Sequence, residues 1–502
     1  MNRANEPGPM FTEIELKLAL PIADPCTLEE RLAHLPLLAR RKATHERLHN
    51  TYYDTPDDML NSQRTALRLR RVGSDDHPVW LQTLKMGGSS DSALSQRGEW
   101  EATVPGPALQ LSLLRATPWL QLDPDSTLFH SLNARFTTDF TRTRWTVRNP
   151  DGGVVEVALD LGQIVVGDRT TSICELELEL KAGSPANLFD IAHQIARTVA
   201  VIPLGGSKAQ RGFALAQNGL DQPMRAQPPA LTPEMHLPAA ALRVLRETYK
   251  HFSGNLHTFL TSDDPEVVHQ ARVGWRRFKT ALALFKELPL AQAVPPLQAL
   301  KPLLKALGRL RDLEVANLQT LPMLANSYVG GSPKRKTHWQ ALQSALAQAT
   351  ADLLHLVRDS LHNPATGVTL LAMTEWLESK HNTDAARGIA VDKKTTLRPW
   401  ATKRLERLRG QLKITLKMTP KPDNLHRARI LAKRLRYGVE ALRPVLPQRR
   451  ARQWHRQSAQ LQSSIGAERD LLQAIGIAKR LKAHSTMLKF LRAVALGRNH
   501  PH

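Results

Sequence analysis

Hydrophobic and polar side chains follow two different periods along the chain, and the change falls near residue 217. Before it, short segments alternate apolar and polar residues, which is typical of β-strands with one buried face. Residues 184–201 differ, because Ser184-Pro185 supplies an N-cap and a first-turn proline and so predicts an amphipathic helix. The first half is predicted to be a β-rich α+β domain. Seven segments alternate: FTEIELKLAL, TALRLRR, VWLQTLK, RGEWEATV, TRTRWTV, GVVEVALDLG and SICELELELK.

The second half is predicted to be almost entirely helical. Five prolines between residues 218 and 238 mark a linker, which we place at 218–236, between domains at 10–217 and 237–496. The second domain is rich in Leu, Ala, Arg, Lys and Gln, and its apolar residues recur at helical spacing. Breaks fall at SPKR, NPATG and TPKPDN. This pattern predicts an all-α helical bundle.

The helical half repeats itself. A basic motif that begins at His269 recurs at His426, 157 residues later, and Gly308-Arg-Leu-Arg-Asp recurs as Gly466-Ala-Glu-Arg-Asp, 158 residues later. Two motifs that keep nearly the same offset indicate a duplication. We therefore predict two pseudo-symmetric halves, at about residues 240–380 and 395–496, related by a pseudo-two-fold axis.

Charge separates the two halves as well. The formal net charge is +23, but residues 1–217 hold 23 basic and 26 acidic side chains, and residues 218–502 hold 46 and 20. Such an excess predicts an anionic partner for the second half: nucleic acid, polyphosphate or an acidic membrane surface. No apolar run is long enough to span a bilayer, and the N-terminus lacks a secretory apolar core. With only Cys26 and Cys174, a disulfide framework is excluded and a cytoplasmic location is expected.

The strands of the first half share an unusual charged face. Residues two apart lie on the same face of a strand, so Glu13, Glu15 and Lys17 line one face, as do Glu175, Glu177 and their neighbours. One interpretation is a solvated outer face, which antiparallel sheets often have. The other is a closed barrel with a polar interior, because clustered glutamates repel one another unless a cation neutralises them. Arginines in the same interior would bind an anion such as phosphate.

These residues resemble a known family. Glu13-x-Glu15-x-Lys17, Tyr52-Tyr-Asp-Thr-Pro56, LRLR, TLK, EVALD, ELELEL and SKAQRG, in this order, are similar to the CYTH superfamily of triphosphate tunnel metalloenzymes, and most similar to its inorganic triphosphatase branch. The resemblance implies a tunnel of eight antiparallel strands that hydrolyses a triphosphate with Mg²⁺ or Mn²⁺. It also implies Lys85, Glu13 and Glu15 as catalytic residues.

The same resemblance implies the ligands in the tunnel. Lys208 matches a late basic position of the family, although a solvated lysine is the alternative there, and Glu156 could orient a basic residue instead of binding metal. Which two of the three glutamates on the ELELEL strand bind the metal stays open. The implied metal ligands are Glu13, Glu15, Asp160, Glu175, Glu177 and Glu179, and the implied triphosphate ligands are Lys17, Arg68, Arg70, Lys85, Arg142, Arg144 and Lys208.

The repeated motif of the second half resembles the CHAD domain. Four positions of each copy fall on one helical stripe about 80° wide: 269, 272, 276 and 279, repeated as 426, 429, 433 and 436. Like charges three or four apart cost about 0.2–0.5 kcal/mol per pair, so the repeat predicts a use for them. The resemblance implies a basic cleft that binds inorganic polyphosphate. Arg311 and Arg469 are weaker candidates for polyphosphate binding, because they could equally form ion pairs with the adjacent aspartates. The implied ligands are His269, Arg272, Arg276, Arg277, Lys279, His426, Arg429, Lys433, Arg434 and Arg436.

Taken together, these patterns favour a metal-dependent hydrolase that converts inorganic triphosphate to pyrophosphate and phosphate, with a polyphosphate-binding helical half and no membrane partner. Two alternatives stay open. One is an enzyme acting on thiamine or nucleoside triphosphates, including ATP cyclisation. The other is a non-catalytic protein that binds polyphosphate or nucleic acid. An aromatic content of 5% favours polyphosphate, because single-stranded nucleic acid is commonly stacked on aromatic side chains.

Overall fold

The computed structural model describes residues 11–21, 24–73, 76–88, 92–387, 396–419 and 422–498. It divides into two compact units. The first comprises Met1–Gln222, Leu260–Ser262 and Leu361–Glu378; the second comprises Pro223–Phe259, Asp263–Ser360 and Ser379–His502. Among the residues that the structure describes, none of the helices has the length and apolar character needed to cross a bilayer.

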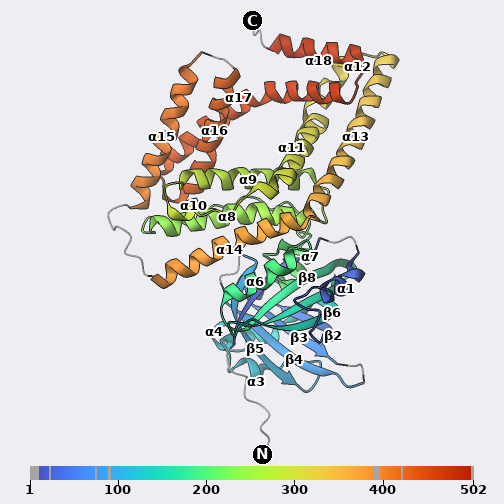
Figure 1. Cartoon of the computed structure of the whole chain (residues 1–502), viewed down its shortest axis with the longest axis vertical. Helices are drawn as coiled ribbons and strands as arrows, with labels where there is room; N and C mark the ends of the chain where they lie inside the picture. The colour runs from blue at the N-terminus through green and yellow to red at the C-terminus, as the bar shows by residue number, and fades with distance from the viewer. Residues whose placement is uncertain are drawn as a thin grey trace, which may run out of the picture. The chain divides into compact units, whose positions relative to one another are not determined.

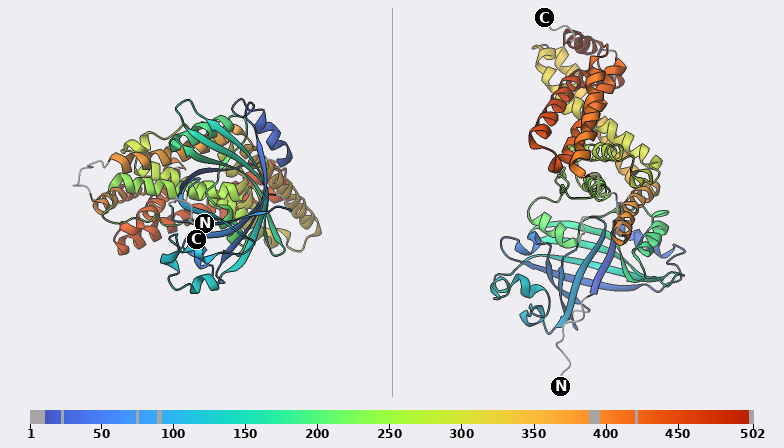
Figure 2. Two further views of the ribbon diagram at one scale, coloured as in Figure 1. Left: turned by 90° about the horizontal axis from the view of Figure 1, so that it is seen from below. Right: turned by 90° about the vertical axis from the view of Figure 1, so that its left-hand side faces the viewer.

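The first unit contains a closed antiparallel barrel of eight strands (Figures 1 and 2). The strand order is β5-β4-β3-β2-β6-β7-β8-β1, β1 pairs with β5 to close the barrel, and the short β9 adds to β1. This confirms the eight-stranded barrel implied by the family resemblance. The strands are β1 (Phe11–Ala19), β2 (Thr44–Asp54), β3 (Ala66–Val72), β4 (Val79–Met86), β5 (Leu94–Val104), β6 (Asn133–Arg148), β7 (Val154–Val166), β8 (Arg169–Ala182) and β9 (Ile202–Pro203).

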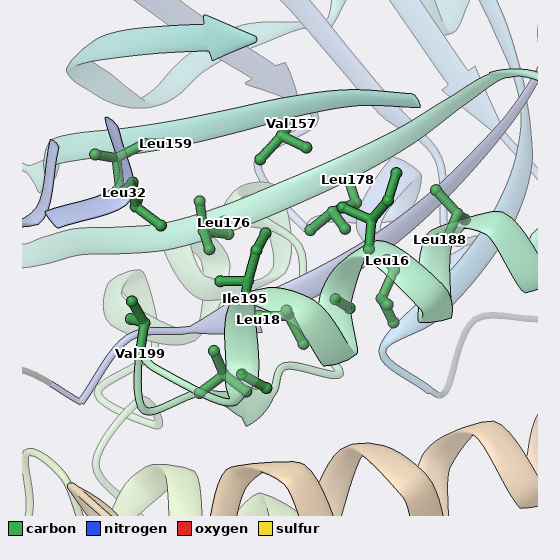
Figure 3. Close-up of a cluster of buried hydrophobic side chains, with 14 of the residues drawn as sticks. Leu16, Leu18, Leu32, Val157, Leu159, Leu176, Leu178, Leu188, Ile195 and Val199 are labelled. Atoms are coloured by element: carbon green, nitrogen blue, oxygen red, sulfur yellow. The ribbon is translucent and has the colours of Figure 1, made fainter. Parts of the chain in front are cut away.

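The apolar faces of β1 and β8 point outward from the barrel. Leu16 and Leu18 of β1 and Leu176 and Leu178 of β8 are completely buried against helices that cover the outside of the barrel. Figure 3 shows these leucines pointing towards Ile195 and its helix. Since side chains alternate along a strand, the glutamates and lysines between these leucines must point to the interior. The polar-interior interpretation is therefore the correct one of the two.

Short helices surround the barrel. The predicted helix at 184–201 is present but ends earlier, at Ala196, and it begins with a capping box between Ser184 and Asn187. A helix that the sequence pattern did not predict starts at Lys208, capped by Ser207 and Gln210. The helices of this part are α1 (Leu28–Ala33), α2 (Met59–Ser62), α3 (Leu111–Leu114), α4 (Trp119–Leu122), α5 (Thr127–His130), α6 (Pro185–Ala196) and α7 (Lys208–Ala216).

The rest of the chain is helical, as predicted. The breaks SPKR, NPATG and TPKPDN fall at the starts of α13, α14 and α16, where proline occupies the first helical position. The helices are α8 (Leu237–Thr258), α9 (Pro265–Leu284), α10 (Pro289–Gln292), α11 (Lys301–Val315), α12 (Ala325–Val329), α13 (Pro333–Leu361), α14 (Pro364–Arg387), α15 (Leu397–Lys417), α16 (Pro422–Leu442), α17 (Gln448–Arg480) and α18 (Ser485–Arg498).

The packing of these helices follows the internal repeat. α8 packs against α9 in the first half, and α15 packs against α16 in the second. Between the halves, α9 contacts α16 and α11 contacts α17, so the helices that carry the repeated motifs meet their own counterparts. Gly274 allows α8 and α9 to approach closely, because a Cβ there would lie 2.7 Å from the backbone nitrogen of Phe252.

Candidate functional site

The barrel interior holds a cavity of about 230 Å³. Of its 22 lining residues, seven are acidic and nine are basic, which makes it a site for charged ligands of both signs. The charged lining residues are Glu13, Glu15, Lys17, Arg68, Arg70, Lys85, Arg97, Glu99, Glu101, Arg142, Arg144, Glu156, Glu177, Glu179, Lys181 and Lys208.

Glu13 and Glu15 of β1 form the first acidic group. Lys85 Nζ donates to both carboxylate oxygens of Glu13, at 2.7 and 2.8 Å. Arg97 bridges the pair, with Nε 3.0 Å from Glu13 and Nη2 2.6 Å from Glu15, and Lys17 also contacts Glu15. Burial opposes the charge on these carboxylates, but the neighbouring cations outweigh it and hold both pKa values below the usual range. Both residues are therefore ionised at neutral pH.

Asp160, Glu175 and Glu177 form a second acidic group, called here the acidic triad. Antiparallel pairing sets Asp160 of β7 directly opposite Glu175 of β8, and one oxygen from each of the three residues lies within 4.8 Å of the others. Arg142 donates to Asp160 at 2.6 and 2.7 Å and also contacts Glu177, while Arg211 lies 2.7 Å from Glu175. Three clustered carboxylates are hard oxygen donors of the kind that Mg²⁺ and Mn²⁺ prefer, so the triad fits such an ion.

Lys208 lies within the acidic triad. Its side chain is 7% exposed, and its ammonium is 2.6 Å from Asp160 and 2.5 Å from Glu175. Burial disfavours that charge, but the carboxylates outweigh it and raise the pKa of Lys208 above its ordinary value. The solvated-lysine alternative is therefore wrong, because this side chain is buried and paired.

Two arginines of β3, Arg68 and Arg70, also line the cavity. Arg70 Nε donates to the neutral amide oxygen of Asn50 at 2.9 Å, whereas Arg68 lies 3.6 Å from Glu99. Burial, together with the nearby guanidinium groups of Arg68 and Arg142, lowers the pKa of Arg70 to about 10. A buried cation that is disfavoured by its cationic neighbours is well placed to bind an anion.

The remaining predicted residues of the cavity lie apart from the triad. Arg144 contacts Glu46 and lies 3.8 Å from Glu156, in keeping with an orienting role for Glu156. Glu179 pairs with Lys181 at 2.6 Å, and burial raises its pKa. Of the three glutamates on β8, the structure thus brings Glu175 and Glu177, and not Glu179, together with Asp160.

Four residues that contact the charged groups of the cavity or the acidic triad were not among the predicted site residues. Arg97 bridges the first acidic group, Glu99 and Glu101 pair with basic residues, and Arg211 pairs with Glu175. Arg97, Glu99 and Glu101 alternate on one face of β5 like the glutamates of β1, so the period-two pattern places them on the charged face without giving them a role. Arg211 lies in the SKAQRG motif on α7, and no strand pattern points to it.

The helical unit brings the two basic stripes together. Lys433 of α16 is surrounded by Arg272 and Arg276 of α9, Arg429 of α16 and Arg469 of α17. Burial, followed by repulsion from Arg276 and Arg429, lowers the pKa of Lys433 to about 7. We call these five residues the basic cluster. Among the described residues, the buried Nε atoms of Arg272 and Arg429 have no hydrogen-bond partner.

Other predicted residues border this cluster or lie away from it. Burial and the charge of Arg311 lower the pKa of His269 to about 4, so this ring is neutral near pH 7. Lys279 is close to Arg276 and Arg434, and His426 is exposed.

Two predicted polyphosphate ligands are held elsewhere. Arg277 is 3% exposed and contacts His251 and the carbonyl of Gln227. Arg436 donates to Glu440 at 3.0 Å. The structure does not bring Arg277 into the basic cluster, because its side chain is fixed in the helical core.

Comparison with known proteins identifies both parts of the chain. The sequence model described as the CYTH domain matches residues 12–213, and the one described as the CHAD domain matches residues 243–478. The chain therefore contains one CYTH domain followed by one CHAD domain.

Several known proteins are similar to parts of this chain. An inorganic triphosphatase of Haemophilus influenzae is 36% identical over 211 residues, which cover 41% of this chain and 55% of that relative. The match thus spans about half the length of the curated relative. Among solved structures, the CHAD domain from Ricinus communis is 24% identical and covers 55% of this chain and 91% of its own, with a TM-score of 0.47. A Hippeastrum protein described as having a dominant triphosphatase activity is 19% identical and covers 40% and 95%, with a TM-score of 0.30.

Proposed function

We propose that the barrel hydrolyses inorganic triphosphate to pyrophosphate and phosphate with Mg²⁺ or Mn²⁺, and that the helical domain binds polyphosphate. The observation that carries the first part is one cavity that holds both buried carboxylates and a half-buried arginine, Arg70, which donates to the neutral amide of Asn50. The similarity to an inorganic triphosphatase supports the same activity.

The side chains suggest how each part of the substrate is handled. Arg68 and Arg70 would bind the phosphoryl oxygens and position the chain, because charge-assisted hydrogen bonds to guanidinium groups are strong and directional. The acidic triad would hold the metal ion, which when bound stabilises negative charge on the phosphoryl oxygens. A water oxygen then bonds to the terminal phosphorus while the bridging P–O bond breaks. Pyrophosphate leaves with that electron pair, and the water proton passes to the products.

The aromatic residues of the cavity favour an inorganic substrate over a nucleotide. Only two aromatic side chains line the described cavity, Tyr52 and Phe140. Tyr52 stacks on Phe136 with 4.7 Å between ring centroids, and Phe140 lies 5.0 Å from the ammonium of Lys208. Each ring already has one partner, which leaves less aromatic surface for stacking on a base or a thiamine ring.

We expect phosphate release from triphosphate to require added Mg²⁺ or Mn²⁺. The reason is that the lining carries carboxylates suited to a hard divalent ion. Release should be measured with triphosphate, pyrophosphate, long-chain polyphosphate, ATP and thiamine triphosphate, each with metal and with excess chelator. Faster release from ATP than from triphosphate would favour the organic alternative, and full turnover in chelator would contradict the metal requirement.

The basic cluster supports polyphosphate binding by the helical domain. Its cations lie close enough together to repel one another, and the buried Nε atoms of Arg272 and Arg429 lack partners within the described chain. An unpaired buried donor costs roughly 1–3 kcal/mol, so a polyanion would satisfy these groups and relieve the repulsion.

The environment of Lys433 in the basic cluster predicts that polyphosphate binding strengthens as the pH falls from 9.5 to 7. The pKa of Lys433 is lowered to about 7 by burial and its arginine neighbours, so much of Lys433 is neutral above that pH. A bound polyanion favours the charged form, and binding therefore takes up a proton. Affinity for long-chain polyphosphate should be measured by calorimetry across this range. Lys433→Arg, whose charge is permanent, should show a much flatter pH dependence, and equal slopes would contradict the assignment.

A further inference from the structure

The ammonium of Lys208 occupies the centre of the donor set that would hold a metal ion. Lys208 Nζ lies 2.6 Å from Asp160, 2.5 Å from Glu175 and 3.0 Å from Glu177. These are the same three carboxylates whose oxygens lie within 4.8 Å of one another. A single side chain thus contacts every member of the acidic triad.

The charges of this group are already balanced. Three carboxylates face three cations, Lys208, Arg142 and Arg211. Adding a divalent ion without removing a cation would leave an excess positive charge in a buried site, which is strongly unfavourable at low dielectric constant. A metal ion and the ammonium therefore compete for the same oxygens.

We propose that Lys208 is a displaceable internal counter-ion, which holds the acidic triad together without metal and moves to the triphosphate when a divalent ion binds. This inference rests on the proposed function of the barrel. It makes Lys208 a positioning residue that couples metal binding to substrate binding.

The surroundings of Lys208 suit such a movement. Its backbone is fixed at the start of α7, where Ser207 and Gln210 form a capping box. Farther along this helix, Phe213 packs against Phe136 in a buried hydrophobic cluster. The four-carbon stem of lysine is flexible, so the ammonium can move while the helix stays in place. The side chain also lines the cavity. Arg142, by contrast, makes two hydrogen bonds to Asp160 and is held more rigidly.

This arrangement makes metal and triphosphate favour each other's binding. The ammonium of Lys208 would leave the triad for the triphosphate oxygens and so free the carboxylates for a metal ion. With a metal ion bound to the carboxylates, the same ammonium would be available to the substrate. By thermodynamic linkage the two effects are equal, and couplings of this kind are typically about 5- to 150-fold.

The test is the affinity of the full-length protein for Mn²⁺, measured from the electron paramagnetic resonance signal of free Mn²⁺. Without substrate, Lys208→Gln should bind Mn²⁺ at least about 10-fold more tightly than the wild type. Non-hydrolysable imidotriphosphate should tighten Mn²⁺ binding to the wild type, and much less to this variant. Its melting temperature should fall without metal and recover with Mn²⁺, so a variant that folds only with Mn²⁺ also supports the proposal.

Lys181→Gln is the matched control. Lys181 lines the same cavity and pairs with Glu179 at 2.6 Å, outside the triad, so removing its charge should change Mn²⁺ affinity little. Equal tightening in both variants, or none in Lys208→Gln while the wild type binds Mn²⁺, would overturn the counter-ion role and leave the proposed hydrolysis intact. If the wild type binds no Mn²⁺ even with imidotriphosphate, the proposed metal-dependent function fails as well.

Discussion

Replacing Glu15 with Gln is expected to lower triphosphate hydrolysis by at least about 100-fold while the barrel stays folded. Glu15 is 3% exposed, and its carboxylate contacts Lys17, Arg97 and Ser95. Changes to groups that merely support a metal ligand cost about 10- to 100-fold in affinity or activity, so loss of a charged group in the site itself should reach the upper end. The amide keeps the volume of the side chain, and the strand therefore keeps its packing.

The measurement is kcat for triphosphate at saturating Mg²⁺ and at saturating Mn²⁺, together with circular dichroism to verify folding. Glu29→Gln provides the control, because Glu29 lies on α1 outside the barrel, is 41% exposed and pairs with His45. It should retain the wild-type rate. A Glu15→Gln enzyme that remains folded and turns over within a few-fold of the wild type would remove Glu15 from the catalytic set.

Alternation of residue types predicted most of the strands of the barrel, because successive side chains of a strand point to opposite faces of the sheet. The exception is β2, with the sequence THERLHNTYYD, which the pattern did not identify as a strand. Its first residues carry few apolar side chains, and only its second half alternates between buried and half-buried positions. Pairing with β3 and β6 on both sides, and not its own hydrophobicity, keeps β2 in the sheet.

The site was predictable as far as it depends on strand faces. Alternation placed Glu13 and Glu15 on one face of their strand, and the burial of Leu16 and Leu18 shows that this face is the interior. Antiparallel register then sets Asp160 opposite Glu175. The contacts of Lys208 with the acidic triad come from a helix that follows the barrel in sequence, and no local pattern encodes that approach.

In the helical unit, spacing could have excluded one predicted residue. Positions 269, 272, 276 and 279 share a helical stripe, whereas Arg277 is turned about 100° from Arg276 and therefore faces the core. The convergence of Arg272 with Lys433, by contrast, depends on the packing of α9 against α16. A sequence repeat can suggest that contact but cannot fix its distances.

Replacing either arginine of β3 with Met removes the charge and keeps much of the volume. Both variants should lose activity, but they should differ in stability. Arg70→Met is expected to lower kcat/KM for triphosphate by about 10- to 100-fold for each hydrogen bond lost, since a hydrogen bond to a charged group contributes about 1.5–3 kcal/mol. Its melting temperature without substrate should hold or rise. The reason is that burial and repulsion from Arg68 disfavour the charge of Arg70 in the folded state, as its lowered pKa shows.

Arg68→Met should lower both activity and stability. Burial opposes the charge of Arg68, but Tyr52, Glu99 and Glu101 outweigh it and raise the pKa, so its removal leaves the two glutamates without that partner. Arg47→Met is the control, because Arg47 pairs with Asp139 and its side chain is 70% exposed. The measurements are kcat/KM for triphosphate and the melting temperature of the three variants. If Arg70→Met destabilises the protein as much as Arg68→Met does and leaves kcat/KM unchanged, Arg70 is a structural residue and the anion-binding part of the cavity has been misassigned.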